Sequence, residues 1–98
     1  MIDLNIPLVE DQPLMIDFYA DWCAPCQMLD PIFAEVQEQL SGKAQFLKID
    51  IDKNPAIASY FDVKSVPTLL IIKNGKEEWR MAGFLFAKDL IKVVEKYI

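Results

Sequence analysis

An almost uninterrupted apolar run, Leu14–Ala20, limits the folds open to this chain because only Asp17 and the hydroxyl of Tyr19 interrupt it. A strand with one wet face alternates apolar and polar residues, whereas a continuous apolar run is typical of a strand buried on both faces. A strand of this kind needs covering layers on both sides of its sheet. The run therefore predicts a strand in the middle of an α/β fold.

A helix is expected directly after this strand, because apolar residues recur there at helical spacing. They are Met28, Leu29, Ile32, Phe33, Val36 and Leu40. Gly42 follows at the place where a helix often ends with glycine. Pro31 lies inside the helix and is expected to kink it, since proline removes one backbone hydrogen bond.

The rest of the chain alternates between strand and helix signals. The predicted elements are a strand over 46–51, a short helix capped by Asn54-Pro55 and ending near Phe61, strands over 68–72 and 77–82, and an amphipathic C-terminal helix with Leu90, Ile91, Val94, Tyr97 and Ile98 on its apolar face. Pro67 opens the third strand, and Asn74-Gly75 predicts a hairpin after it. We therefore expect a mixed central β-sheet flanked by helices on both faces, with the first two strands parallel.

Residues 1–13 carry no clear signal and are predicted to hold a short strand or a helical turn. The four residues between Val9 and Leu14 are too few for a full crossover connection. A chain of 98 residues with 53% hydrophobic composition can build one core. We expect residues 1–98 to form a single domain.

Charge is distributed unevenly along the chain, and the net charge is −5. Residues 1–42 contain eight acids and no Lys or Arg, and all ten basic residues lie in 43–98. This argues against nucleic-acid binding, which depends on clustered Lys and Arg. No apolar run has the length of a membrane span, and the N-terminus lacks the basic segment and cleavage signature of a secretory peptide. A cytoplasmic protein is expected, with no nucleic-acid or membrane partner.

The only two cysteines, Cys23 and Cys26, are three positions apart. A disulfide between them would close a very small loop and add little stability, and structural disulfides are rare in the cytosol. A structural zinc site needs about four ligands, and the chain has no histidine and no third cysteine, so a dimer would have to share two pairs. Dithiol redox chemistry is the strongest of these three interpretations.

The position of the pair suits that chemistry. Cys23 comes just after a buried strand and at the start of a helix, and Pro25 fits a first helical turn. Free backbone amides and the positive end of the helix dipole stabilise an anion there, which favours a thiolate at Cys23. Residues three apart in such a turn share a face, so the two sulfurs are able to join and separate with little backbone movement.

The segment Asp17–Cys26 closely resembles the active-site segment of the thioredoxins. Members of that family have a lowered cysteine pKa in their Cys-x-x-Cys motif. The resemblance continues through Pro31, Lys48–Asp52, Asn54-Pro55, Val66–Thr68, Asn74-Gly75 and Gly83, and it covers nearly everything from residue 14 onward. It implies the thioredoxin fold and a protein-disulfide reductase. It also implies recycling by a thioredoxin reductase, disulfide-containing client proteins, a monomer, and no metal or cofactor besides the redox-active disulfide.

The resemblance implies a role for each matching residue. Cys23 would be the exposed nucleophile, Cys26 the shielded resolving thiol, Asp17 a proton relay and Lys48 its ionic partner. The substrate groove would be formed by Trp22, Ala24, Pro25, Val66, Pro67 in the cis form, and Gly83.

The residues themselves support some of these roles and leave alternatives. Asp17 interrupts an apolar strand, so burial would raise its pKa and suit a relay; alternatively, its side chain faces solvent. Lys48 lies between Leu47 and Ile49, where a solvent-facing lysine would be unremarkable. The Trp22 side chain either packs in the hydrophobic core or lines the substrate groove.

Three departures from the family pattern stand out. Ala24 replaces the usual glycine, which leaves the redox potential open. Gln27 replaces a residue that is often basic, and with Asp21 and Asp30 nearby it predicts a less stabilised Cys23 thiolate and a preference for basic partner surfaces. The N-terminus is too short for the usual first strand and helix, which predicts a truncated edge of the sheet.

Two alternative functions remain open from the sequence. One is a disulfide oxidase or isomerase, and the other is a non-catalytic binding module.

Overall fold

The structure, a computed structural model, describes residues 3–98; Met1 and Ile2, which belong to the undecided segment 1–13, lie outside the described residues. The elements in chain order are β1 (Leu14–Tyr19), α1 (Ala24–Gln39), β2 (Gln45–Asp50), α2 (Pro55–Tyr60), β3 (Thr68–Lys73), β4 (Lys76–Ala82) and α3 (Ala87–Glu95). Residues 3–13 contain neither a strand nor a helix. The prediction of a short strand or a helical turn is therefore wrong for residues 3–13, and no strand or helix precedes β1 in this described segment.

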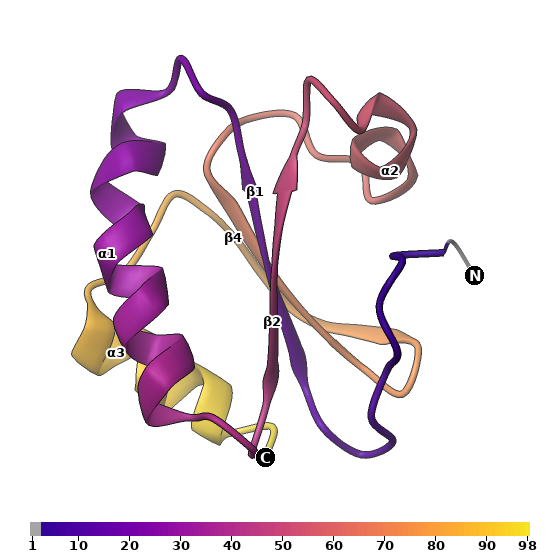
Figure 1. Cartoon of the computed structure of the whole chain (residues 1–98), viewed down its shortest axis with the longest axis vertical. Helices are drawn as coiled ribbons and strands as arrows, with labels where there is room; N and C mark the ends of the chain where they lie inside the picture. The colour runs from indigo at the N-terminus through magenta and orange to yellow at the C-terminus, as the bar shows by residue number, and fades with distance from the viewer. Residues whose placement is uncertain (1–2) are drawn as a thin grey trace.

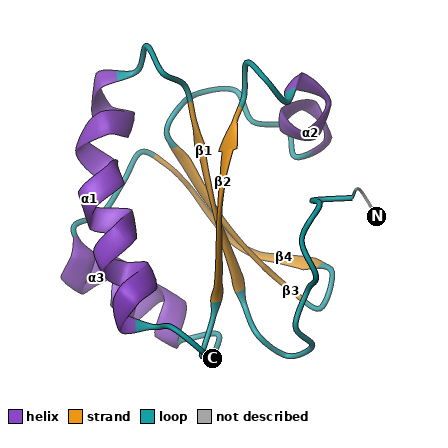
Figure 2. Ribbon diagram, in the orientation of Figure 1, coloured by secondary structure: helices purple, strands orange, loops and turns teal. Residues whose placement is uncertain are grey.

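The four strands form one mixed sheet in the order β2-β1-β3-β4. β1 pairs in parallel with β2 and antiparallel with β3, and β4 pairs antiparallel with β3, as the sequence predicts. Asn74 and Gly75 take positive φ angles of 50° and 80° in the β3–β4 hairpin, the conformation that Asn-Gly turns allow at low cost. Figure 1 and Figure 2 show α1 and α3 on one side of the sheet and α2 on the other.

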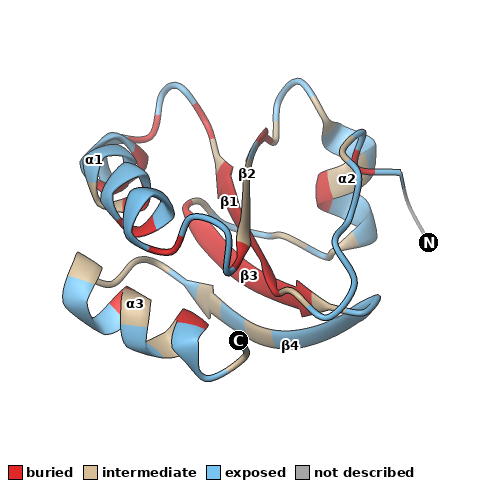
Figure 3. Ribbon diagram, turned by 60° about the horizontal axis from the view of Figure 1, so that its bottom comes forward, coloured by how far each residue is buried: buried red, intermediate tan, exposed pale blue. Residues whose placement is uncertain are grey.

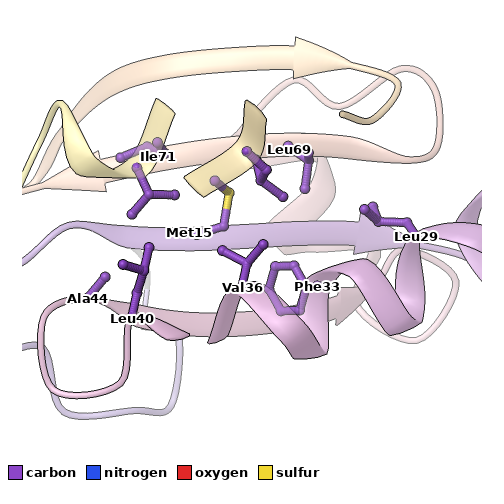
Figure 4. Close-up of a cluster of buried hydrophobic side chains, with 10 residues drawn as sticks. Met15, Leu29, Phe33, Val36, Leu40, Ala44, Leu69 and Ile71 are labelled. Atoms are coloured by element: carbon purple, nitrogen blue, oxygen red, sulfur yellow. The ribbon is translucent and has the colours of Figure 1, made fainter. Parts of the chain in front are cut away.

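Both faces of β1 are buried, which confirms the interpretation of the apolar run. On the α1 and α3 side, Met15 packs with Leu29, Phe33, Val36 and other side chains (Figure 4). On the α2 side, a second cluster contains Leu4, Leu14, Ile16, Phe18, Ile49, Leu70 and Ile72. Figure 3 shows the buried strands β1 and β3 between exposed helix surfaces. Two apolar layers therefore hold β1 from both sides.

Several sequence-based expectations need adjustment at element ends. α1 contains Pro31, as predicted, and it ends at Gln39 with Leu40 as the C-cap residue, before Gly42. The Asn54 side chain does not cap α2; its amide donates to the Asp50 carbonyl oxygen at 3.1 Å instead. The C-terminal helix ends at Glu95, and Ile98 is 51% exposed, so its predicted place on the apolar face is wrong. Leu90 and Val94 are fully buried and carry the packing of α3.

Candidate active site

Cys23 is the N-cap residue of α1, between the end of β1 and the first helical turn. Its backbone is extended, with φ −93° and ψ 109°, and its Sγ accepts a hydrogen bond from the Cys26 amide at 3.2 Å. An N-cap side chain normally uses an oxygen for this purpose, because the first amides of a helix have no partner within the helix. A Cys23 thiolate at this position would therefore be stabilised by a helix amide and by the helix dipole.

Cys23 and Cys26 are joined by a disulfide, and their Cα atoms are 5.2 Å apart. That distance falls within the range that disulfides require, so the predicted geometry of the i and i+3 pair is confirmed. Cys26 is 2% exposed and Cys23 is 4% exposed. The prediction of an exposed Cys23 is wrong for this disulfide form, because both cysteines pack with Ala20, and the partly buried Tyr19, Ile51 and Val66 cover this cluster.

Asp17 lies in β1 and is fully buried, so its alternative, solvent-facing placement is excluded. Among the described residues, neither of its carboxylate oxygens has a hydrogen-bond partner. Burial raises the pKa of Asp17 to about 7; the charge of Lys48 opposes this rise and that of Asp30 adds to it. A carboxyl group with a pKa near 7 can both accept and release a proton at neutral pH.

Lys48 is directly beside Asp17 in the sheet, since the two residues are register partners in the β1–β2 ladder. Its ammonium nevertheless forms its ion pair with Asp30 of α1, with Nζ 2.5 Å from Oδ1. The same Nζ is 4.5 Å from the centre of the Tyr19 ring, within the range of a cation–π contact. Lys48 therefore acts on Asp17 through charge, while its direct partners in the described chain are Asp30 and Tyr19.

The residues predicted to form a groove differ in exposure. Trp22 is 70% exposed, and Ala24 and Pro25 are exposed beside it. Val66 packs against the cysteine cluster, and the Val66–Pro67 peptide bond is cis, as the resemblance implies. The Gly83 amide donates to the Pro67 carbonyl oxygen at 2.8 Å. Gly83 has φ +117° and open space where a Cβ would stand, so its backbone, more than its surroundings, requires glycine.

Two contacts near the cysteines were not predicted from the sequence. The indole Nε1 of Trp22 donates to Asp52 at 2.9 Å, which fixes the ring on the surface and excludes Trp22 as a core residue. The second contact is the ion pair between Asp30 and Lys48, which depends on how α1 packs on the sheet. A helical position four residues after Cys26 could have marked Asp30 as lying on the same face of α1.

Neither a metal site nor a membrane span is found in the described part of the chain. Within residues 3–98, no three His, Cys, Asp or Glu side chains gather where they could hold a metal ion. None of the helices found there combines the length and apolar character needed to cross a bilayer.

A cysteine pair at the N-terminus of a helix, directly after a strand that carries a buried carboxyl group, is the arrangement of a thiol–disulfide oxidoreductase. The family model described as Thioredoxin matches residues 5–96, and the chain belongs to the thioredoxin family. The predicted fold class and the disulfide-reductase activity are thereby confirmed.

Curated relatives and solved structures agree with this assignment. The chain is 40% identical to a thioredoxin of Rickettsia felis over 91 residues, which cover 93% of this chain and 87% of the relative. It is also 40% identical to a thioredoxin of Staphylococcus saprophyticus over 84 residues, covering 86% and 81%. Thioredoxin of Fasciola hepatica superposes with a TM-score of 0.84 at 28% identity, covering 91% of this chain and 84% of that one. A mutant thioredoxin from Halobacterium salinarum gives 0.81 at 39%, covering 90% and 75%.

Proposed function

We propose that this chain reduces disulfides of client proteins, with Cys23 as the attacking thiolate and Cys26 as the resolving thiol. The observation that supports this most strongly is the position of Cys23 as the N-cap of α1, where its sulfur accepts the Cys26 amide hydrogen bond. An anionic sulfur is the nucleophile in disulfide exchange, and this position favours it.

The reaction begins when the Cys23 thiolate attacks one sulfur of a client disulfide. A Cys23–client mixed disulfide forms, the client S–S bond breaks, and the released client thiolate takes up a proton from solvent. Cys26 then attacks the Cys23 sulfur and forms the intramolecular disulfide; the bond between Cys23 and the client breaks, and the second client thiolate also takes up a proton from solvent. The client gains two electrons and two protons, and the Cys23–Cys26 dithiol is oxidised.

Asp17 is proposed to accept the proton of the Cys26 thiol before this second attack. Thiols attack as thiolates, and Cys26 is too buried for bulk water to serve as a ready base. The pKa of Asp17, raised by burial to about 7, matches this task at neutral pH. Lys48 is proposed to act on Asp17 through its positive charge.

The groove proposed for the client chain lies between Trp22 and the loop segments at Pro67 and Gly83, with Ala24, Pro25 and Val66 completing it. Trp22 offers an exposed aromatic face. The exposed acids around the pair, Asp21, Asp30 and Asp52, favour client surfaces with basic residues near the disulfide.

The wider setting is also part of the proposal. A thioredoxin reductase would return two electrons to the Cys23–Cys26 disulfide after each turnover, and no further cofactor is required. The chain would work as a single domain, residues 1–98, and as a monomer. A cytoplasmic location is consistent with a catalytic cysteine pair and no other cysteine in the chain.

Insulin reduction with dithiothreitol as electron source tests the activity, since separation of the insulin chains is followed by turbidity. The wild type should accelerate turbidity well above dithiothreitol alone. Cys26→Ser should form a stable mixed disulfide with a client peptide through Cys23, detectable by mass spectrometry. A binding module without redox activity would accelerate nothing, and failure of the Cys26→Ser variant to trap the client peptide through Cys23 would refute the assigned roles.

A further inference from the structure

Asp30, Lys48 and Tyr19 form a small charged cluster at the edge of the redox site. Asp30 lies on α1 four residues after Cys26, so the two side chains share a helix face. Lys48 lies on β2, level with Asp17 of β1, and Tyr19 is two residues after Asp17 on the same strand. Residues two apart in a strand face the same side of a sheet. Asp17 and Lys48 are thus register partners in the sheet, and the half-exposed Lys48 side chain reaches Asp30 of α1.

Lys48 interacts electrostatically with two carboxyl groups, those of Asp30 and Asp17, and in the described structure it bonds only that of Asp30. Its Nζ donates to Asp30 Oδ1 at 2.5 Å and lies over the Tyr19 ring, while both oxygens of Asp17 lack a hydrogen-bond partner among residues 3–98. Partial burial alone would lower the pKa of Lys48, but its hydrogen bond and attraction to Asp30, with smaller contributions from Asp17 and Tyr19, raise it. The ammonium is therefore firmly charged and directed toward Asp30.

The groups that surround Asp17 come from three elements. β2 provides the positive Lys48, α1 provides the negative Asp30, and β3 places the uncharged Leu69 opposite Asp17. A direct hydrogen bond from Lys48 would stabilise the charged form of Asp17 and weaken it as a base. Asp17 is consequently a better base when the Lys48 ammonium bonds Asp30 than when it bonds Asp17.

We propose that Asp30 is a positioning residue for the redox site: it holds the Lys48 ammonium at the surface and withholds it from Asp17, which leaves Asp17 free to accept the Cys26 proton. This inference rests on the relay role given to Asp17 in the proposed function. Asp30 raises the pKa of Asp17 in two ways: it holds the Lys48 ammonium away from Asp17, and its own negative charge favours the protonated form of Asp17. Only the first way requires Lys48.

The test is a titration of the Asp17 carboxyl carbon by NMR in the oxidised, full-length protein. Four proteins are compared: wild type, Asp30→Asn, Lys48→Met and the double variant. Asp21→Asn is the matched control, because Asp21 is an exposed acid beside the cysteines and its removal changes the net charge equally. Asp30→Asn should lower the Asp17 midpoint by about one pH unit or more, the size expected when a cation moves within hydrogen-bonding distance.

The double variant separates positioning from simple charge. Positioning by Asp30 predicts that Asp30→Asn shifts the Asp17 midpoint about half as much, or less, when Lys48 is absent. An equal shift with and without Lys48, no shift at all, or the same shift in Asp21→Asn would overturn the proposal. The pH profile of insulin reduction should move in the same direction as the midpoint.

The relay itself is tested separately by the rate at which Cys26 resolves a mixed disulfide in Asp17→Asn. An unchanged rate at pH 7 would refute the relay given to Asp17, whereas the titration would still show whether Asp30 controls the place of Lys48. The two failures are thus distinguishable.

Discussion

The junction between β1 and α1 and the N-terminal segment 3–13 are held in different ways. At the junction, contacts are local: the Cys23 amide donates to the Ala20 carbonyl at 3.2 Å, and the Cys26 amide donates to Cys23 Sγ at 3.2 Å. The N-terminal segment depends on distant side chains, because Gln45 Oε1 accepts from the Val9 amide at 2.9 Å and Gln45 Nε2 donates to the Pro7 carbonyl at 2.7 Å. Contacts between sequence neighbours thus position the cysteine pair, whereas long-range contacts hold the N-terminal segment against the rest of the fold.

A second long-range contact reinforces the N-terminal segment. The Asp11 amide donates to Asn74 Oδ1 at 2.9 Å, and Asn74 Nδ2 donates to Asp11 Oδ1 at 2.8 Å. Leu4 is buried against the α2 face of the sheet, where Figure 1 also shows this segment. Changes at the junction should therefore affect activity, and changes in these anchors should affect stability.

Cys23→Ser removes the attacking sulfur at the junction between β1 and α1 and should have the largest effect on activity. The rate of insulin reduction should fall to that of dithiothreitol alone, because the hydroxyl of serine is not ionised at neutral pH. Serine is a good N-cap, so the reduced protein should unfold in urea with a free energy within about 1 kcal/mol of the reduced wild type. Residual catalysis by this variant would contradict the role of Cys23.

Asp17→Asn should stabilise the protein at high pH. Because the folded-state pKa of Asp17 is raised from 3.8 to about 7, the folded protein binds a proton that the unfolded chain has lost across that interval, and stability falls as pH rises through it. The neutral amide removes this loss, so the variant should gain on the order of 4 kcal/mol over wild type at pH 9 and little at pH 4. Urea unfolding at both pH values measures it; equal gains at both would refute the shift.

Gln45→Ala removes the side chain that makes two hydrogen bonds to the N-terminal segment. Two backbone groups near the surface lose their partner and turn to water instead, so the variant should lose about 1 kcal/mol of unfolding free energy. Gln39→Ala, at the exposed end of α1, is the matched control and should change stability by less than about 0.5 kcal/mol. Both variants should reduce insulin at the wild-type rate at 25 °C; a slower Gln45→Ala would mean that the two regions are coupled.

Gln27→Lys should have the smallest effect. It tests how a nearby positive charge changes the ionisation of Cys23. Gln27 donates to the Asp21 carbonyl at 3.2 Å and carries no charge, so a lysine there adds a cation near Cys23. The pH midpoint of Cys23 alkylation in the reduced protein should fall by less than about one unit. An unchanged or higher midpoint would show that the missing cation is not what limits the thiolate.

Sequence patterns predicted the regions whose signals are local. The buried run of β1, the Asn74-Gly75 hairpin and the cysteine pair at a helix start each lie within a few residues, and the structure has all three. Two features needed the folded chain. The coverage of Cys23 by Val66 joins residues far apart, and the choice of Lys48 between Asp17 and Asp30 depends on a side-chain arrangement that spacing does not encode.

Alkylation of the reduced protein at pH 7 with one equivalent of iodoacetamide, followed by mass spectrometry of the peptides, probes the thiolate held at the start of α1. Cys23 should carry the label and Cys26 should remain free, because only Cys23 has the N-cap position. A folded protein in which Cys23 stays unmodified, or in which Cys26 is labelled first, would contradict this account.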